Sequence, residues 1–177
     1  MSAAPVIRDA LAGDVPALAD AASRFFLATY EHLSDPDDIA AHVAEHFGTE
    51  TIAAEFERAE VRYLVAIGDG DIVGFIKLRR GDNPDALADR DAIEVQQLYV
   101  SPDCQRGGIG RRLMDRAVAI AADEGADGIW LSVWEDAHWA TRFYEGYGMR
   151  PLGELEFRVG KTSYVDLLMW LPLKPGD

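Results

Sequence analysis

The residues best suited to chemistry lie between Ser101 and Met114, where the chain reads SPDCQRGGIGRRLM. Three glycines fall within four residues, and arginines stand on both sides of them. A strand ending at Val100 and a helix starting near Gly108 would point unsatisfied backbone amides and the positive end of a helix dipole at one spot. Glycines would let phosphate oxygens approach those amides closely. The stretch therefore predicts an anion site, and a diphosphate is the expected ligand.

The spacing of this loop excludes two familiar diphosphate-binding patterns. A dinucleotide fingerprint, GxGxxG, needs a glycine three residues past Gly110, where Leu113 stands, and the pattern GxxxxGK followed by Ser or Thr has no match. Arg106, Arg111 and Arg112 are informative because the chain carries 31 Asp and Glu against 17 Lys and Arg. The alternative interpretation is a tight strand-to-helix turn without a ligand.

The composition limits the classes of partner. A net charge of −14 disfavours a nucleic-acid backbone and favours a small cationic molecule; the alternative interpretation is acidity that serves solubility alone. The 177 residues, 49% of them hydrophobic, predict one domain with a substantial core. The start MSAAPVIRDA lacks a basic and apolar leader, and no apolar run reaches the length of about 20 residues of a membrane span. We therefore expect a soluble cytoplasmic protein that needs no membrane.

The elements that must position the loop follow from the hydrophobic pattern. The first third predicts an edge strand at VIRDA and three helices. These helices are expected from Asp14 to about His32, from Pro36 onward, and from Thr49, as the cap, through Glu60. From Val61 the pattern is β-rich, with a hairpin around GDGD. Next are expected a strand at Ala92–Val100, a helix from Gly108 to Gly125, the strand GIWLSVW, a short helix at Ala137–Tyr147, and the strands LGELEFRV and SYVDLLMWLPL. This order predicts an α/β domain with a mixed sheet.

Two motifs resemble those of the GNAT (Gcn5-related) N-acetyltransferases. LYVSPDCQRGGIG, from Leu98 to Gly110, is similar to motif A of that family, whose core is Gln or Arg, two residues, Gly, one residue, then Gly or Ala. FYEGYGMRPLGE, from Phe143, resembles motif B. With the hairpin, the resemblance covers about Val61 to Leu173. FFLATYEHLSDPDDI, FGTETIAAEF and FRVGKTSYVDLLMWLPL extend it to the PaiA-type branch of bacterial polyamine acetyltransferases.

The resemblance implies a fold and a cofactor site. The fold would be the GNAT acyl-CoA N-acyltransferase fold, α/β with a mixed, mostly antiparallel sheet of six to seven strands flanked by helices, in a single domain over residues 1–177. Helices at about 14–60 would line the acceptor side, and the cofactor-binding core would span about 61–173. Loop amides would hold the pyrophosphate of acetyl-CoA, and the Val100 amide would polarise the thioester carbonyl. The implied cofactor-binding residues are Leu98, Tyr99, Val100, Gln105, Arg106, Gly107, Gly108, Ile109, Gly110, Arg111 and Phe143.

Acetyl transfer to an amine needs a base for the ammonium group, whose pKa is roughly 10, and an acid for the leaving thiolate. The resemblance implies Tyr144 as the acid. Glu94, on the strand that leads into the loop, is the candidate base, acting directly or through water. The alternatives are a water chain without a dedicated base, or Glu94 as a strand-face or acceptor-binding carboxylate; Gln96 would then have no chemical role. Motif B often carries Asn where this chain has Ala137, which leaves one cofactor hydrogen bond unassigned.

We therefore expect an acetyl-CoA-dependent N-acetyltransferase that acetylates a primary amine, such as spermidine or spermine, by direct attack in a ternary complex. An aminoglycoside, an amino acid or a protein lysine is an alternative acceptor, and a non-catalytic acyl-CoA-binding regulator is an alternative function. HVAEH, from His42 to His46, fits an inverted zinc-protease motif but lacks a third ligand, so no metal is expected. The resemblance also makes a homodimer a candidate assembly.

Overall fold

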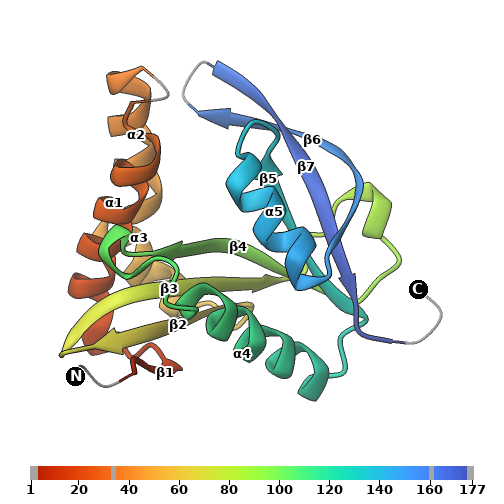
Figure 1. The fold of residues 1–177 in the computed structure, drawn as a ribbon, viewed down its shortest axis with the longest axis horizontal. Coiled ribbons are helices and arrows are strands. Elements are labelled where there is room, and N and C mark those ends of the chain that lie inside the picture. Colours follow the sequence, from red (N-terminus) through yellow and green to blue (C-terminus); the bar gives the residue numbers. More distant parts are fainter. Residues whose placement is uncertain (1–3, 33–34, 160–161, 175–177) are drawn as a thin grey trace. The chain divides into compact units, whose positions relative to one another are not determined.

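A computed structural model describes residues 4–32, 35–159 and 162–174 of the chain (Figure 1). Seven strands of the described residues form one sheet in the order β1-β2-β3-β4-β5-β7-β6. The elements are β1 (Val6–Asp9), α1 (Val15–Tyr30), α2 (Pro36–Phe47), α3 (Thr49–Phe56), β2 (Val61–Gly68), β3 (Asp71–Arg80), β4 (Ala92–Val100), α4 (Ile109–Asp123), β5 (Gly128–Trp134), α5 (His138–Tyr147), β6 (Arg150–Val159) and β7 (Thr162–Pro172). The expected α/β class and mixed sheet are confirmed, because β4 and β5 run parallel while β1–β2, β5–β7 and β6–β7 run antiparallel.

Three boundaries of the first and third helices differ from the sequence expectation. The third helix begins after Gly48, which has no side chain for capping, so Thr49 is its first residue and not its cap. It ends at Phe56 rather than Glu60, because the amide of Glu57 turns back to the carbonyl of Ala54 in a tighter final turn. The first helix ends at Tyr30 rather than His32. Ser34, part of the expected second helix start, lies outside the described residues.

The residues group into two compact units, which we describe separately. The first unit comprises residues 1–77 and 97–114, and the second comprises 78–96 and 115–177. Strands β3 and β4 and helix α4 therefore each contribute residues to both units. None of the described helices combines the length and the apolar character that crossing a membrane requires.

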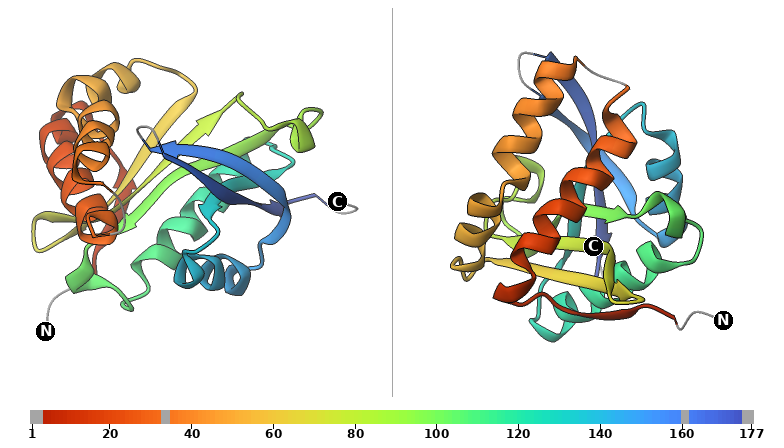
Figure 2. Two further views of the ribbon diagram at one scale, coloured as in Figure 1. Left: turned by 90° about the horizontal axis from the view of Figure 1, so that it is seen from above. Right: turned by 90° about the vertical axis from the view of Figure 1, so that its left-hand side faces the viewer.

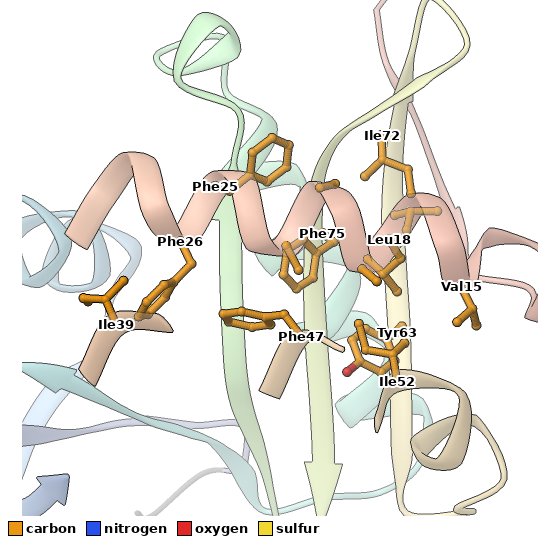
Figure 3. Close-up of a cluster of buried hydrophobic side chains, with 14 residues drawn as sticks. Val15, Leu18, Phe25, Phe26, Ile39, Phe47, Ile52, Tyr63, Ile72 and Phe75 are labelled. Atoms are coloured by element: carbon orange, nitrogen blue, oxygen red, sulfur yellow. The ribbon is translucent and has the colours of Figure 1, made fainter. Parts of the chain in front are cut away.

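The core of the first unit lies between α1 and the strands β2 and β3 (Figure 3). Leu18 and Phe25 on α1 are 0% and 2% exposed, and Phe75 on β3 is 0% exposed. Burial of each such side chain is worth about 1.5–3 kcal/mol. The apolar stripe expected on the first helix therefore fixes that helix against β2 and β3.

The second unit is built on a ladder of β4, β5, β7 and β6. The β4–β5 pairing covers Ala92↔Gly128 through Glu94↔Trp130, and β5 pairs along its whole length with β7. Strands β6 and β7 run side by side as a long hairpin (Figure 2). Gly128 is required here, because a Cβ atom at this position would lie 2.4 Å from the Trp170 ring.

Candidate functional site

The glycine-rich loop begins where β4 ends, in the first unit. The amide of Ser101 donates to the carbonyl of Val73 on β3 over 2.9 Å, which anchors the start of the loop to the sheet. A short 3₁₀ turn at Pro102–Cys104 follows. The Gln105 amide nitrogen Nε2 lies 3.4 Å from the carbonyl oxygen of Val100, a long hydrogen bond that spans the base of the loop. These two hydrogen bonds therefore fix the start of the loop to β3 and to the end of β4.

Two residues of the loop have a left-handed backbone conformation. Arg106 has φ 68° and Gly108 has φ 75°, both in the left-handed region, which is unfavourable for a side chain such as that of arginine. Helix α4 starts directly afterwards, and its first intrahelical bond runs from the Arg112 amide to the Gly108 carbonyl over 3.0 Å. The amides of Gly108, Ile109 and Gly110 precede that bond and point out of the helix start. This combination suits an anion, because left-handed turns and helix starts direct several N–H groups to one point.

The start of α4 is held by a glycine that the sequence reasoning did not single out. A Cβ atom on Gly74 of β3 would lie 3.2 Å from the Ile109 side chain and 3.2 Å from the Tyr99 carbonyl oxygen. Ile109 and Leu113 are 4% and 0% exposed. The absent side chain lets the first turn of α4 lie directly on the strand. A lone glycine within a strand pattern was the available signal.

An aromatic cluster surrounds Tyr99, one of the expected cofactor-binding residues. The ring centroid of Tyr99 lies 5.7 Å from that of Phe75. In the same cluster, the Phe26 ring on α1 stacks on the His42 ring with centroids 4.6 Å apart. Burial lowers the pKa of His42 to about 4, with a smaller contribution from the charge of His46. His42 is therefore neutral at physiological pH and packs as part of the cluster. Within the described part of the chain, no group of three or more His, Cys, Asp and Glu side chains could hold a metal ion.

Glu94, the candidate base, belongs to the second unit. It is 9% exposed and lies opposite Trp130 in the β4–β5 ladder. The guanidinium Nε of Arg79 donates to Oε2 of Glu94 over 2.8 Å, and Nη1 of Arg79 lies 3.1 Å from Asp82. Sequence reasoning missed Arg79, because the register between neighbouring strands is needed to bring these two residues together. The ion pair orients the carboxylate.

Tyr144, the candidate acid, lies on α5 in the second unit. The helix ends at Gly148, whose φ of 111° is left-handed, and the Met149 amide then donates to the Tyr144 carbonyl over 3.0 Å. The Tyr147 hydroxyl donates to Asp115 on α4 over 2.8 Å, which ties the two helices. Phe143 and Tyr144 are half-buried, with ring centroids 5.2 Å apart. Ala137 at the start of α5 is fully buried and offers no polar side-chain atom in place of the motif's Asn.

The second unit also buries polar side chains that were not expected to act. Asp166 on β7 is 4% exposed, and the Ser132 hydroxyl of β5 donates to its carboxyl group. Oδ1 of Asp166 and Oε1 of Gln96 are buried and have no hydrogen-bond partner among the described residues. Burial raises the pKa of Asp166, and the Ser132 bond opposes that shift. An acidic residue inside an otherwise apolar strand, SYVDLLMW, was the signal for this group.

The expected site residues thus fall into two sets. The loop set lies on one continuous strand, turn and helix of the first unit: Leu98, Tyr99, Val100, Gln105, Arg106, Gly107, Gly108, Ile109, Gly110 and Arg111. The second set, Glu94, Phe143 and Tyr144, belongs to the second unit. The loop set offers backbone donors for an anion, and the second set offers a carboxylate and a phenol for proton transfer.

Comparison with known sequences identifies relatives of this chain. Residues 16–149 match the acetyltransferase (GNAT) family. An uncharacterised N-acetyltransferase of Mycobacterium bovis is 33% identical over 156 residues, which cover 88% of this chain and 96% of that protein. An uncharacterised N-acetyltransferase encoded in the pepI 3′ region of Lactobacillus delbrueckii subsp. lactis is 23% identical and covers 88% of this chain and 90% of its own length.

Solved structures share the fold. The PaiA N-acetyltransferase of Thermoplasma acidophilum, in complex with coenzyme A, superposes with a TM-score of 0.76 at 21% identity and covers 96% of this chain and 99% of its own. A nourseothricin acetyltransferase superposes with a TM-score of 0.56 at 27% identity over 66% of this chain and 67% of that chain. The arrangement of sheet and helices is therefore that of known acetyltransferases.

Proposed function

Because this chain belongs to the acetyltransferase (GNAT) family and is an N-acetyltransferase, we propose that it transfers an acetyl group from acetyl-CoA to a small polyamine such as spermidine or spermine. The observation that carries the donor assignment is the loop that precedes α4. Two left-handed residues and a helix start direct backbone amides to one point, next to the exposed side chains of Arg106, Arg111 and Arg112. That is a cationic anion site in a chain of net charge −14.

The loop fits the pyrophosphate of acetyl-CoA. A Cβ atom on Gly108 would meet nothing within 4 Å, so the position is open to an approaching phosphate oxygen. The amides from Arg106 to Arg111 would hold the pyrophosphate, with Gln105 shaping the base of the loop. The main chain of Leu98 and Tyr99 would contact the pantetheine arm, and Phe143 would pack against it.

Acetyl-CoA supplies the acetyl group as a thioester. The amide of Val100 donates to the carbonyl oxygen and stabilises the negative charge that develops during attack. Glu94, oriented by Arg79, accepts a proton from the acceptor ammonium, directly or through water, so that the neutral amine can form the new C–N bond. The hydroxyl of Tyr144 gives its proton to the sulfur as the C–S bond breaks. The nitrogen loses a second proton as the amide forms, and that proton restores the Tyr144 phenol directly or through water. Glu94 returns the first proton to solvent.

The acceptor assignment is supported by charge and by the sequence resemblance to polyamine acetyltransferases. An acidic surface attracts polycations and raises their local concentration. The PaiA neighbour is only 21% identical, so its structure supports the fold and not the acceptor. The name of the nourseothricin acetyltransferase makes nourseothricin a second acceptor to test, since that protein is 27% identical over 66% of this chain.

A thiol-release assay with acetyl-CoA tests this proposal. The acceptors are spermidine, spermine, nourseothricin, an aminoglycoside, amino acids and lysine peptides, with an amine-free reaction as the blank. We expect release with spermidine or spermine, and a mass increase of the amine corresponding to one acetyl group. Release with another acceptor alone would overturn the polyamine assignment, and release with no amine would overturn the proposed activity.

A further inference from the structure

We propose that Asp166, Ser132 and Gln96 form a subsite for an ammonium group of the acceptor other than the amine that is acetylated. This inference rests on the proposed function, because it requires an acceptor that carries at least two cationic groups. It assigns a role to buried polar atoms that the transfer chemistry described above does not use.

The β4–β5 pairing ends at Glu94↔Trp130, and alternation along the strands beyond it puts these three side chains on one face of the second unit. Directly paired residues point to the same face of a sheet, and residues two apart along a strand do so as well. Glu94 pairs with Trp130, so Gln96 and Ser132, each two residues further on, share the face of Glu94. Asp166 pairs with Trp134, two residues beyond Ser132. The candidate base and the proposed subsite therefore lie on the same face.

Burial makes the subsite expensive to leave without a ligand. An unsatisfied buried polar group costs about 1–3 kcal/mol, and a charged one costs more. Oδ1 of Asp166 and Oε1 of Gln96 have no hydrogen-bond partner in the described chain, and both atoms are acceptors. Two acceptors, one of them anionic, call for a cationic donor. An alkylammonium group meets that need, because it carries a positive charge and several N–H donors.

Aromatic rings beside Asp166 favour the same ligand. Trp134 is the residue paired with Asp166 across the ladder, and Tyr164 precedes Asp166 by two positions on β7. Their rings meet edge to face, with centroids 5.7 Å apart and an interplanar angle of 81°. Aromatic faces attract ammonium groups through their negative quadrupole. A buried carboxylate next to an aromatic pair is therefore suited to an organic cation.

The test compares an acceptor that has additional ammonium groups with one that does not. Spermidine is the first probe, and butylamine, which carries the reactive amine alone, is the second. For Asp166→Asn we expect KM and the calorimetric Kd for spermidine to rise about tenfold or more, the change that loss of a charge-assisted hydrogen bond produces. The kcat/KM for butylamine and the Kd for acetyl-CoA should stay within about twofold.

Glu154→Gln is the matched control. It removes the same charge from the neighbouring strand β6, where Glu154 is exposed and pairs with Leu167. We expect this variant to bind spermidine like the wild type. Equal loss in both variants would show a general charge effect and overturn the subsite. Gln96→Leu is a second test of the subsite, useful if Asp166→Asn does not fold. It too should weaken the binding of spermidine and leave the kcat/KM for butylamine unchanged.

The outcomes separate this inference from the proposed function. If the wild type acetylates spermidine and Asp166→Asn binds it equally well, the subsite is wrong and the activity stands. If the wild type acetylates nourseothricin alone and Asp166→Asn weakens its binding, the polyamine assignment is wrong and the subsite stands. If no amine supports release, calorimetry still decides, because spermidine binding that is unchanged by Asp166→Asn, or absent from the wild type, overturns the subsite.

Discussion

Two buried polar clusters of this chain differ in how completely their groups are paired. In the first unit, Nζ of Lys77 lies 2.5 Å from Oε1 of Glu55, and the Tyr63 hydroxyl donates to the other oxygen of the same carboxylate. In the second unit, Asp166 receives a hydrogen bond from Ser132, and its Oδ1 has no partner among the described residues. The first cluster is satisfied by the protein itself, so it serves the fold. The second has capacity left for a ligand.

The largest expected effect comes from breaking the satisfied cluster. Lys77 is 4% exposed and the Glu55 side chain is 16% exposed, so Lys77→Met leaves the largely covered carboxylate of Glu55 without its cation. We expect a loss of about 3–5 kcal/mol in the free energy of unfolding, measured by urea denaturation. The double variant Lys77→Met with Glu55→Leu should recover most of that loss, because it removes the abandoned charge. A loss below about 1 kcal/mol in the single variant would show that the cluster does not stabilise the fold.

The unsatisfied cluster should respond in the opposite direction. Burial raises the pKa of Asp166 in the folded state, so the folded protein holds this proton more tightly than the unfolded chain does. The wild type therefore loses stability as pH rises from about 4 through the raised pKa. We expect Asp166→Asn to be more stable by about 1–3 kcal/mol at neutral pH and to match the wild type near pH 4. A less stable Asp166→Asn at neutral pH would contradict this contrast.

His42 is a half-buried side chain, and here the loss of solvent favours the neutral form. Its pKa falls to about 4 in the folded state, from an ordinary value of 6.5. Acidification should therefore destabilise the wild type between about pH 6.5 and 4, because the unfolded chain takes up this proton first. In His42→Phe, the loss of unfolding free energy between about pH 6.5 and 4 should be smaller than in the wild type by about 1–3 kcal/mol. Thermal melts at several pH values measure this loss, and an identical loss in the variant would count against this role.

The smallest effect concerns the loop that precedes α4. Arg106→Gly removes an arginine from the left-handed region, whereas Arg106→Ala removes the same charge and keeps a Cβ atom there. We expect the glycine variant to be more stable than the alanine variant by about 1 kcal/mol. Both should bind acetyl-CoA more weakly than the wild type, because both lose the charge. Equal stability of the two variants would mean that the turn stores no strain.

Much of the fold could be predicted from sequence because local patterns carry it. The glycines of the loop, the apolar stripe of α1 and the turn at GDGD gave the order of elements, and the structure confirms that order. The end of α3 at Phe56 could not be read, because Glu57 and Arg58 are compatible with a helix and only the backbone shows the tighter turn.

Side-chain partners were less accessible, because they depend on register between strands distant in sequence. Arg79 meets Glu94 only once β3 and β4 are in place. Likewise, Ser132 and Asp166 are brought together by the β5–β7 ladder. The two motifs predicted that backbone amides of the loop bind the cofactor and that the Tyr144 phenol is the acid. Both assignments remain predictions that kinetics must test.

The most direct test of the account is the turnover of Tyr144→Phe. Tyr147→Phe is the matched control, since it deletes a hydroxyl from the same helix, one that donates to Asp115. With the acceptor that supports thiol release, Tyr144→Phe should lower kcat by about 10²–10⁴-fold, the contribution of a general acid, and should change the Kd for acetyl-CoA little. Tyr147→Phe should retain near-normal turnover. Near-normal kcat in Tyr144→Phe would contradict the proposed transfer mechanism.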